Sequence, residues 1–474
     1  MDVRAKLARL RTMDPPPGLF RASDAAAAAQ AAAAQTPPAA ISGDVIGAKS
    51  QRIAQLRALI GEVAARDKRR VAPEPELPAS SAPGWPCVTT EHGMLYVHER
   101  WLEPEHHHGC RPVRGGLRGA QTTLHALLRD ASLPAVDLSR ALYLDTETTG
   151  LAGGTGTVAF LVGLARFDAE SLGVEQLIVP QLGAEAPVLA RLAERIAAAS
   201  CIVTYNGKSF DWPLLRTRFV LARLPVPVLP PHIDLLHVCR SVWKARLPSL
   251  RLTDMEREIL RFERQDDLPG AEIPARYFEF LRTGRAERLT AVLEHNQNDL
   301  IALAALLGAI TDQFERVCEP SDPLDAVSFG RVALRAGQLE RAGELAAWAQ
   351  EHGAHHVDTD VLARALVFGS DVERQRGRLA ESIALLERAR VHQRVPLSRR
   401  RLHFRLAKRD EHELGDLTAA LRHARNTEAV EGADLHGRRL GRLHRRLLRR
   451  AHLSSAPLRR RRSRVLSEGG AVES

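Results

Sequence analysis

Apolar residues in the middle of the chain alternate between short continuous runs and longer stretches with helical spacing. The runs at 141–146 and 201–205 are typical of buried strands, whereas 186–199 and 286–310 repeat apolar residues every three or four positions, as helices do. Further strands are predicted at 157–166, 173–179 and 232–236, and a further helix at 209–224. Three strands with short connections, followed by strands separated by helices, predict an α/β fold with a mixed five-stranded sheet flanked by helices.

The segments before this region have a different pattern. Residues 1–85 are rich in alanine and proline, so we expect them to be mostly disordered, with one possible helix over 45–70. Residues 86–136 begin with two short strands around His92-Gly93, which predict a β-hairpin followed by a connecting segment. We place the α/β domain itself at 137–312.

Beyond residue 325 the strand signals disappear and three similar segments recur. Each reads Gly-x-Leu-x-x-small, starting at Gly337, Gly377 and Gly415, with separations of 40 and 38 residues. A helix, a glycine turn and a second helix fit each segment. We therefore predict an all-α, tetratricopeptide-like repeat region over 325–452, although its period exceeds the usual ~34 residues. An ordinary helical bundle with glycine turns is the alternative.

The positive charge is concentrated near the C-terminus. The net charge is +10, and residues 438–464 hold twelve arginines with no lysine and no acid, so the rest of the chain carries about −2. Leu440, Leu443 and Leu447 would line one face of a helix here, and we predict a basic disordered tail over 453–474. A polybasic segment binds phosphate backbones through counterion release. A membrane surface and a solvated chain end are the alternatives.

Composition also bears on the compartment. Five scattered cysteines without paired spacing favour a reducing environment. The sequence contains no run of eighteen apolar residues, so no transmembrane segment is predicted, and the first residues lack the apolar stretch of a secretory signal. We expect a cytoplasmic protein. Several histidines near Cys110 have no recognisable zinc-ligand spacing.

Candidate chemistry begins with Asp145 and Glu147 at the end of a predicted strand. Residues i and i+2 of a strand point to the same face. Two carboxylates there repel each other and lose hydration, and a divalent cation between them would remove both penalties. Mg²⁺ prefers oxygen ligands and keeps several waters, which leaves positions for phosphate. The alternative is a surface strand end with two solvated acids.

Two other acids belong to helical segments. Asp211 opens a predicted helix, where an acid also favours the helix dipole by ~0.3–1 kcal/mol without any further role. His295 and Asp299 are four residues apart, so they share one face of a long helix that is otherwise apolar. A buried helix that keeps a histidine and an acid on one face indicates a site, although a solvated helix edge would also tolerate them.

The four carboxylates together predict a site for two divalent metal ions, Mg²⁺ or Mn²⁺. Asp145, Glu147, Asp211 and Asp299 would be the ligands, with the ions ~3.5–4 Å apart as in two-metal hydrolysis of phosphodiesters. His295 would accept the proton of the attacking water, because its ordinary pKa of ~6.5 suits a base near neutral pH. These five residues are the predicted catalytic set.

The order of these motifs resembles that of the DEDD (DnaQ-like) 3′–5′ exonuclease superfamily, which has a ribonuclease H-like fold. Bacterial YprB-type ribonuclease H-like proteins are similar over LDTETTGL, YNGKSFDWPLL, HIDLLHVCRSVWK and HNQND, and the likeness covers roughly residues 86–310. A helical-repeat C-terminus also suits that group. The resemblance implies the same four metal ligands and His295 as the base. However, the histidine branch usually places its base five residues before the last Asp, and His295 lies four before Asp299.

The same motifs contain four residues that we predict to contact substrate, namely Thr148, Asn206, Phe210 and Asn296. The resulting hypothesis is a metal-dependent 3′–5′ exonuclease acting on single-stranded DNA or RNA, with a possible protein partner on the helical repeats. A binding scaffold with a weak or inactive nuclease domain and a structure-specific endonuclease are the two alternatives.

Overall fold

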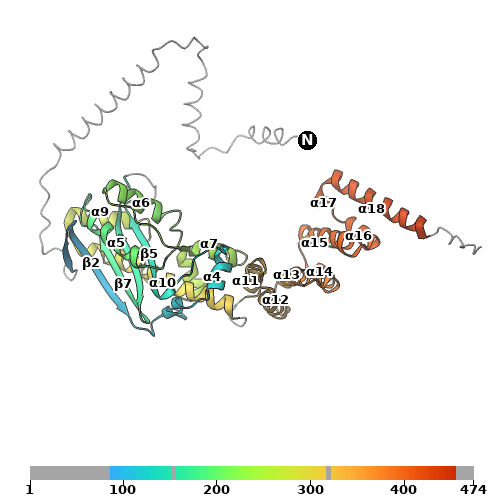
Figure 1. The fold of residues 1–474 in the computed structure, drawn as a ribbon, viewed down its shortest axis with the longest axis horizontal. Helices are drawn as coiled ribbons and strands as arrows, with labels where there is room; N and C mark the ends of the chain where they lie inside the picture. The colour runs from blue at the N-terminus through green and yellow to red at the C-terminus, as the bar shows by residue number, and fades with distance from the viewer. Residues whose placement is uncertain (1–85, 151–155, 317–321, 455–474) are drawn as a thin grey trace, which may run out of the picture. The chain divides into compact units, whose positions relative to one another are not determined.

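The computed structural model of the protein describes residues 86–150, 156–316 and 322–454. Its main sheet has seven strands in the order β1-β2-β7-β6-β5-β8-β9, and β3 pairs with β4 in a small separate ribbon (Figure 1). The strands are β1 (Cys87–Thr90), β2 (Gly93–Leu102), β3 (His107–His108), β4 (Arg111–Pro112), β5 (Ala141–Thr148), β6 (Ala159–Asp168), β7 (Ser171–Ile178), β8 (Cys201–Thr204) and β9 (His232–Asp234).

The sheet is mixed, as the sequence predicts. Strands β5, β6 and β7 form an antiparallel meander, whereas β8 pairs parallel with β5 and β9 parallel with β8. These are the five predicted strands. The predicted hairpin β1–β2 adds two more, because β2 pairs with β7 from Tyr96 to Leu102. The carboxyl ends of β5, β8 and β9 therefore lie at the same edge of the sheet.

Helices cover both faces of the sheet, and alternation along β5 separates the two cores. Leu142 and Leu144 pack with helices α5, α6 and α9, whereas Tyr143 packs with α7 and α10. The helices of this part are η1 (Val113–Leu117), α4 (Gln121–Leu128), η2 (Leu138–Arg140), α5 (Ala186–Ala198), α6 (Asp211–Leu221), α7 (Leu235–Val242), α8 (Leu252–Met255), η3 (Glu256–Leu260), α9 (Ile273–Thr283), η4 (Ala286–Leu289) and α10 (Thr290–Glu315).

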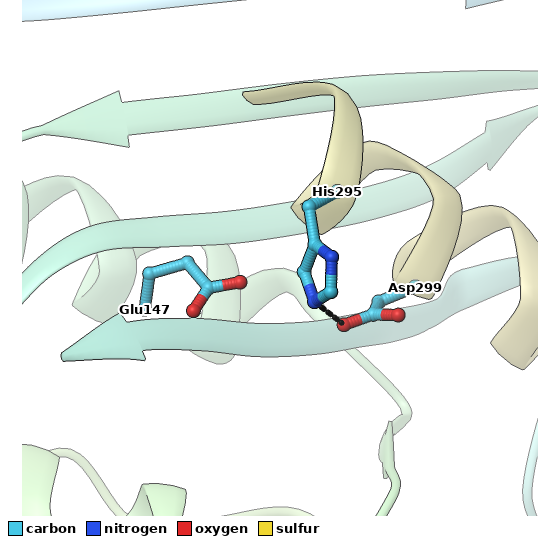
Figure 2. Close-up of side chains that lie close together, drawn as sticks. All are labelled: Glu147, His295 and Asp299. Atoms are coloured by element: carbon cyan, nitrogen blue, oxygen red, sulfur yellow. Dashed lines mark ion pairs between the residues drawn. The ribbon is translucent and has the colours of Figure 1, made fainter. Parts of the chain in front are cut away.

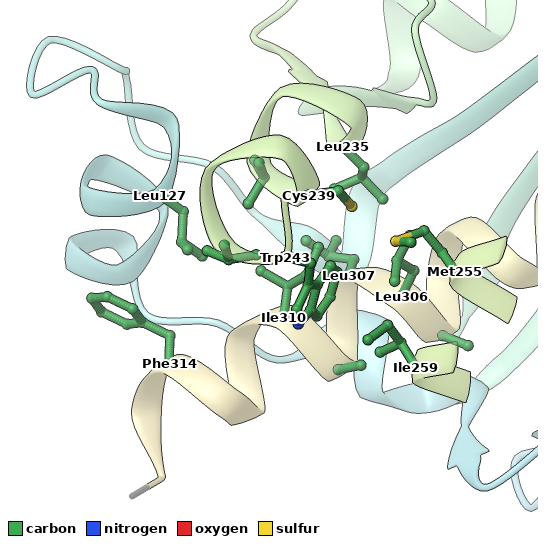
Figure 3. Close-up of a cluster of buried hydrophobic side chains, with 14 of the residues drawn as sticks. Leu127, Leu235, Cys239, Trp243, Met255, Ile259, Leu306, Leu307, Ile310 and Phe314 are labelled. Atoms are coloured by element: carbon green, nitrogen blue, oxygen red, sulfur yellow. The ribbon is translucent and has the colours of Figure 1, made fainter. Parts of the chain in front are cut away.

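The long helix α10 organises the larger core. Its leucines and alanines are almost all fully buried because they pack against the sheet and against α7 and α4 at once. Figure 3 shows Trp243, at the end of α7, beside Leu307 and Ile310 of α10. The backbone of η1 passes close to α10 at Gly308, where an added Cβ would lie 2.6 Å from the carbonyl carbon of Gly115. The helix that carries His295 and Asp299 is therefore firmly anchored.

The C-terminal region is helical, and the three repeated glycines occupy turns between helices. Gly337, Gly377 and Gly415 have φ of 76°, 79° and 69°, the left-handed conformation that glycine adopts without strain. Each glycine separates one helix from the next, as predicted. The helices are α11 (Pro323–Arg335), α12 (Leu339–Gly353), α13 (Thr359–Gln375), α14 (Leu379–His392), α15 (Pro396–Arg409), η5 (Asp410–Leu414), α16 (Leu417–Ala424), α17 (Glu428–Glu431) and α18 (Ala433–Ser454).

The arginine-rich segment forms an amphipathic helix, α18. Leu443 is fully buried against α16, and Leu440 and Leu447 pack beside it, so the predicted apolar face is used inside the protein. On the polar side, Arg442 and Arg446 donate to the buried carboxylate of Glu411 at 3.1 and 3.0 Å. Part of the C-terminal positive charge therefore stabilises the helical region itself.

The possible helix at 45–70 and the basic segment after 454 lie outside the described residues. Among the helices that are described, none has both the length and the apolar character needed to cross a membrane.

Candidate metal centre

The carboxyl end of β5 carries the centre of the site. Asp145 and Glu147 are half-buried and, being two residues apart on one strand, point to the face that α10 covers. Glu147 comes together with His295 and Asp299, and one ligand atom from each lies within 4.8 Å of the others. Figure 2 shows His295 between the two carboxylates. The strand end and the helix thus present three potential metal ligands to one point.

His295 has a defined orientation. Its Nδ1 lies 2.8 Å from Oδ1 of Asp267, a residue of the loop before α9, and its Nε2 lies 3.7 Å from Oδ2 of Asp299. The guanidinium of Arg264 also lies near Nδ1, but at 3.4 Å, so the shorter contact is with Asp267. A carboxylate at Nδ1 favours the tautomer that carries the proton there and leaves Nε2 to accept one. The ring nitrogen toward the acidic cluster is therefore the one available for base chemistry.

Asp211 approaches from the other side of β5. It is the first residue of α6 and is buried, with 6% of its surface exposed. The hydroxyl of Thr146 donates to its Oδ1 at 2.5 Å. The side chain of Thr146 points to the opposite face of β5 from those of Asp145 and Glu147. Asp211, which Thr146 contacts, therefore lies beside the tight cluster rather than within it. The strand end is nevertheless acidic on both sides.

Burial and neighbouring charges raise the pKa of three of the predicted ligands. Burial, followed by the charges of Asp299, Asp211 and Glu147, raises the pKa of Asp145 well above its ordinary range. Burial and the charges of Asp299 and Asp211 raise the pKa of Glu147 in the same way. Burial raises the pKa of Asp211 to about 6, with the Asp234 and Asp299 charges adding to the effect. Carboxylates that resist ionisation together are those that a cation would stabilise.

The donor set fits a hard divalent cation. All four acids offer carboxylate oxygens, the ligand atoms that Mg²⁺ and Mn²⁺ prefer. Asp211 is buried and the other three are half-buried. Glu147, Asp299 and His295 are already gathered, while Asp145 and Asp211 flank them.

A buried arginine, which the sequence did not single out, already compensates part of this negative charge. Arg264 has only 5% of its side chain exposed, donates to Asp299, and lies 2.7 Å from Glu256 and 3.4 Å from Asp267. Burial opposes its charge, but Asp299 and Glu256 raise its pKa above the ordinary value. Arg264 is therefore a permanent cation at the edge of the site.

The charge network continues away from the site through Glu256. This fully buried carboxylate also accepts from Nε2 of His108 at 2.7 Å, and the His108 ring stacks on Phe262 with centroids 3.8 Å apart. The ribbon β3–β4 is thereby connected to Arg264 and Asp299. No local pattern marks Glu256 or Arg264, since their role follows from tertiary contacts alone.

The predicted substrate contacts occupy different environments. Thr148 is nearly buried and donates to the carbonyl of Gly150 at 2.9 Å. Asn206 lies in the turn after β8 with φ of 67°, and its backbone nitrogen donates to Asp234 at 2.8 Å. Phe210, next to Asp211, is 40% exposed. The Thr148 side chain thus has a structural contact of its own, the Asn206 backbone is fixed in its turn, and Phe210 presents a free aromatic surface.

Asn296, the fourth predicted substrate contact, has no exposed surface. Its Nδ2 donates to Oδ2 of Asp145 at 2.8 Å, and its Oδ1 accepts from Gln176 at 2.9 Å. The hydrogen bond favours the ionised form of Asp145 and opposes the rise of its pKa. The structure places Asn296 behind Asp145, where it fixes the orientation of the Asp145 carboxylate.

The sheet, its flanking helices and the acidic strand end together define a ribonuclease H-like domain. Residues 142–311 match the RNase_H superfamily. The chain is 40% identical over 166 residues to "Uncharacterized protein YprB" of Bacillus subtilis (strain 168), covering 35% of this chain and 40% of that protein. The match thus spans less than half of that relative's length.

Among solved structures, the chain is similar to the family B DNA polymerase from the hyperthermophilic archaeon Pyrobaculum calidifontis. The TM-score is 0.30 and the sequence identity 14%, over 47% of this chain and 29% of the polymerase chain.

Proposed function

We propose that this protein is a two-metal nuclease that hydrolyses phosphodiester bonds, acting as a 3′–5′ exonuclease on single-stranded DNA or RNA. The observation that carries the proposal is the acidic cluster at the end of β5. One ligand atom each from Glu147, His295 and Asp299 lies within 4.8 Å of the others, and the charges of Asp299 and Asp211 raise the pKa of both Asp145 and Glu147. Structural acids are rarely placed so that neighbouring acids make them harder to ionise. The arrangement is understandable as a cation site.

Bound Mg²⁺ or Mn²⁺ would activate a water and stabilise the charge that develops on the phosphate and the leaving oxygen. The chain's own residues have distinct tasks. Asp145 and Glu147 offer ligands from β5, with Asp145 oriented by Asn296. Asp211 and Asp299 complete the acidic set from α6 and α10.

His295 is the proposed general base. Its Nδ1 faces Asp267 at 2.8 Å, so its Nε2 can accept a proton on the side of Glu147 and Asp299. Asp267 would stabilise the imidazolium that forms, as a carboxylate does for a catalytic histidine. The exonuclease direction rests on the order of the motifs, which resembles the DEDD superfamily.

The test uses 5′-end-labelled linear strands, and separately circular strands, of single-stranded DNA and RNA, each incubated with Mg²⁺ or Mn²⁺. We expect stepwise shortening of linear strands from the 3′ end, no cleavage of circles, and no reaction in EDTA or with Asp145→Asn. Cleavage of circles would establish an endonuclease. If the unaltered protein cleaves nothing while it binds the strands, the scaffold alternative holds.

The helical region has a separate proposed role. The three helix–glycine–helix units resemble tetratricopeptide-like repeats, and such arrays present surfaces to protein or RNA partners. Helices α11 to α13 share the core of the sheet and α10, so the deletion must begin after them. Deleting residues 396–474 should leave metal-dependent hydrolysis of short oligonucleotides intact if the repeats recruit partners. Loss of partner capture without loss of hydrolysis is the result that supports this role.

A further inference from the structure

Two neighbouring hollows adjoin the turn that leads to Asp211. The first, about 750 Å³, lies between α4, the edge strand β9 and α7, and Lys208 lines it. The second, about 520 Å³, lies between the 205–206 turn, α7 and the 248–252 loop. Arg240 lines both, so the hollows meet across α7.

Cations dominate the lining. The α7 cationic surface, as we name it, consists of five exposed basic residues: Arg129, Lys208, Arg240, Lys244 and Arg251. None of the five takes part in an ion pair with another described residue, whereas Arg264, Arg246 and Arg218 are all paired with acids. A set of cations left without counterions provides a binding potential for an anion.

The lining also contains two acids, Asp234 and Asp130, so five cations against two acids leave three positive charges in excess. Asp234 is buried, and its oxygens accept from the backbone nitrogens of Asn206, Lys208 and Leu236. Asp130 accepts from the backbone and hydroxyl of Ser132. The Asp234 contacts also fix the 206–208 turn, which holds Lys208 at the border of the first hollow.

The surface lies at the same edge of the sheet as the acidic site. Strands β5, β8 and β9 run parallel, so Glu147 near the end of β5, the 206–208 turn after β8 and helix α7 after β9 all lie at the carboxyl ends of these strands. Between Lys208 and Asp211 stands the half-exposed ring of Phe210. A cationic path with an aromatic side chain at the end nearest the metal ligands is the combination that binds a single nucleic-acid strand.

We propose that the α7 cationic surface binds the sugar–phosphate backbone of the strand whose end occupies the acidic site. The inference rests on the proposed nuclease function and adds the route that the strand follows. Phosphates would lie along Lys208, Arg240 and Lys244, and a base next to the reacting end would stack on Phe210. Sequence preference is not expected, because backbone and stacking contacts are common to all bases.

The test measures binding of fluorescein-labelled oligothymidylate and oligouridylate by anisotropy, in EDTA so that no cleavage occurs. Arg240→Gln/Lys244→Gln removes two charges from the surface. Arg216→Gln/Arg282→Gln is the matched control, because both arginines are exposed on α6 and α9, away from α7. The salt slope of binding should fall by about 1.4 for two lost contacts, equivalent to about 20-fold weaker binding at 0.1 M salt.

Arg129→Gln/Lys208→Gln should weaken binding in the same direction, and circular dichroism verifies that each variant is folded. Equal weakening in the control would mean that only overall charge matters and would overturn the proposal, as would unchanged binding in both surface variants. The chemistry is tested separately with the unaltered protein, Mn²⁺ and the p-nitrophenyl ester of thymidine 5′-phosphate. If the protein binds strands through α7 but does not hydrolyse this ester, the proposed binding surface stands and the proposed nuclease function is refuted.

Discussion

Gly163 lies directly opposite Asp145 in the antiparallel pair of β5 and β6, and its missing side chain leaves the space that the amide of Asn296 fills. An added Cβ at position 163 would lie 2.2 Å from Oδ1 and 2.7 Å from Nδ2 of Asn296. The hydrogen bond from Asn296 to Asp145 therefore depends on a glycine in the neighbouring strand.

Gly163→Ala should reduce metal-dependent hydrolysis although it removes no acid. The methyl group displaces Asn296, and a misplacement of about 1 Å at a catalytic ligand costs up to about 10²-fold in rate. Overpacking should also destabilise the fold by about 1–3 kcal/mol. Steady-state kinetics and urea unfolding measure the two effects. Gly270→Ala, where the added Cβ has open space, should alter neither, and a variant at 163 with wild-type kinetics would contradict the role of Asn296.

Arg264→Ala should destabilise the metal-free protein by about 3–5 kcal/mol, because breaking a buried ion pair on one side leaves the buried Glu256 with His108 alone. Mn²⁺ should recover part of this loss, since a cation near Asp299 replaces the guanidinium that donates to it. Urea unfolding with and without Mn²⁺ measures both terms. Arg257→Ala, an exposed arginine of η3 with its own acid partners, should have little effect. If Arg264→Ala lowers the free energy of unfolding equally with and without Mn²⁺, Arg264 has no role in the metal centre.

The fold class and five of the strands could be predicted because their signals are local. Continuous apolar runs marked β5 and β8, and the glycines at 337, 377 and 415 marked turns that require a left-handed backbone. The attachment of β1–β2 to β7 could not be predicted in the same way. Pairing between strands far apart in the chain depends on packing that no local pattern encodes, so the sheet has seven strands where five were expected.

The acids of the site could be predicted because chemistry requires their residue types at strand and helix ends. Their supporting residues could not. Arg264 is one arginine among many in a loop, and its importance comes from burial among Glu256, Asp267 and Asp299. Asn296 adjoins His295 in the motif, which favoured a substrate contact, but the helix turns its side chain inward to Asp145.

The metal-free protein should become more stable relative to Asp211→Asn as the pH falls from 7 to about 4. Burial raises the pKa of Asp211 from 3.8 to about 6 in the folded state, so the folded protein binds a proton more tightly than the unfolded chain does. The stabilisation is complete below 3.8 and is lost as the pH rises through about 6, amounting to about 2–3 kcal/mol. Urea unfolding in EDTA at several pH values measures the difference. With Mn²⁺ the dependence should reverse, because metal binding requires the carboxylate.

Glu411→Ala should loosen α18 without affecting the acidic site. Glu411 is fully buried and accepts from Arg442 and Arg446, which hold the polar side of α18 while Leu443 packs on α16. Loss of these charge-assisted hydrogen bonds, whose arginines are half-exposed, costs about 1–2 kcal/mol. Amide hydrogen exchange along α18 should accelerate about tenfold, since 1.4 kcal/mol is a factor of ten in an opening equilibrium. The exposed Glu428→Ala on α17 is the control. Unchanged exchange in the Glu411 variant would show that the leucine face alone fixes the helix, leaving the α18 arginines free for a phosphate partner.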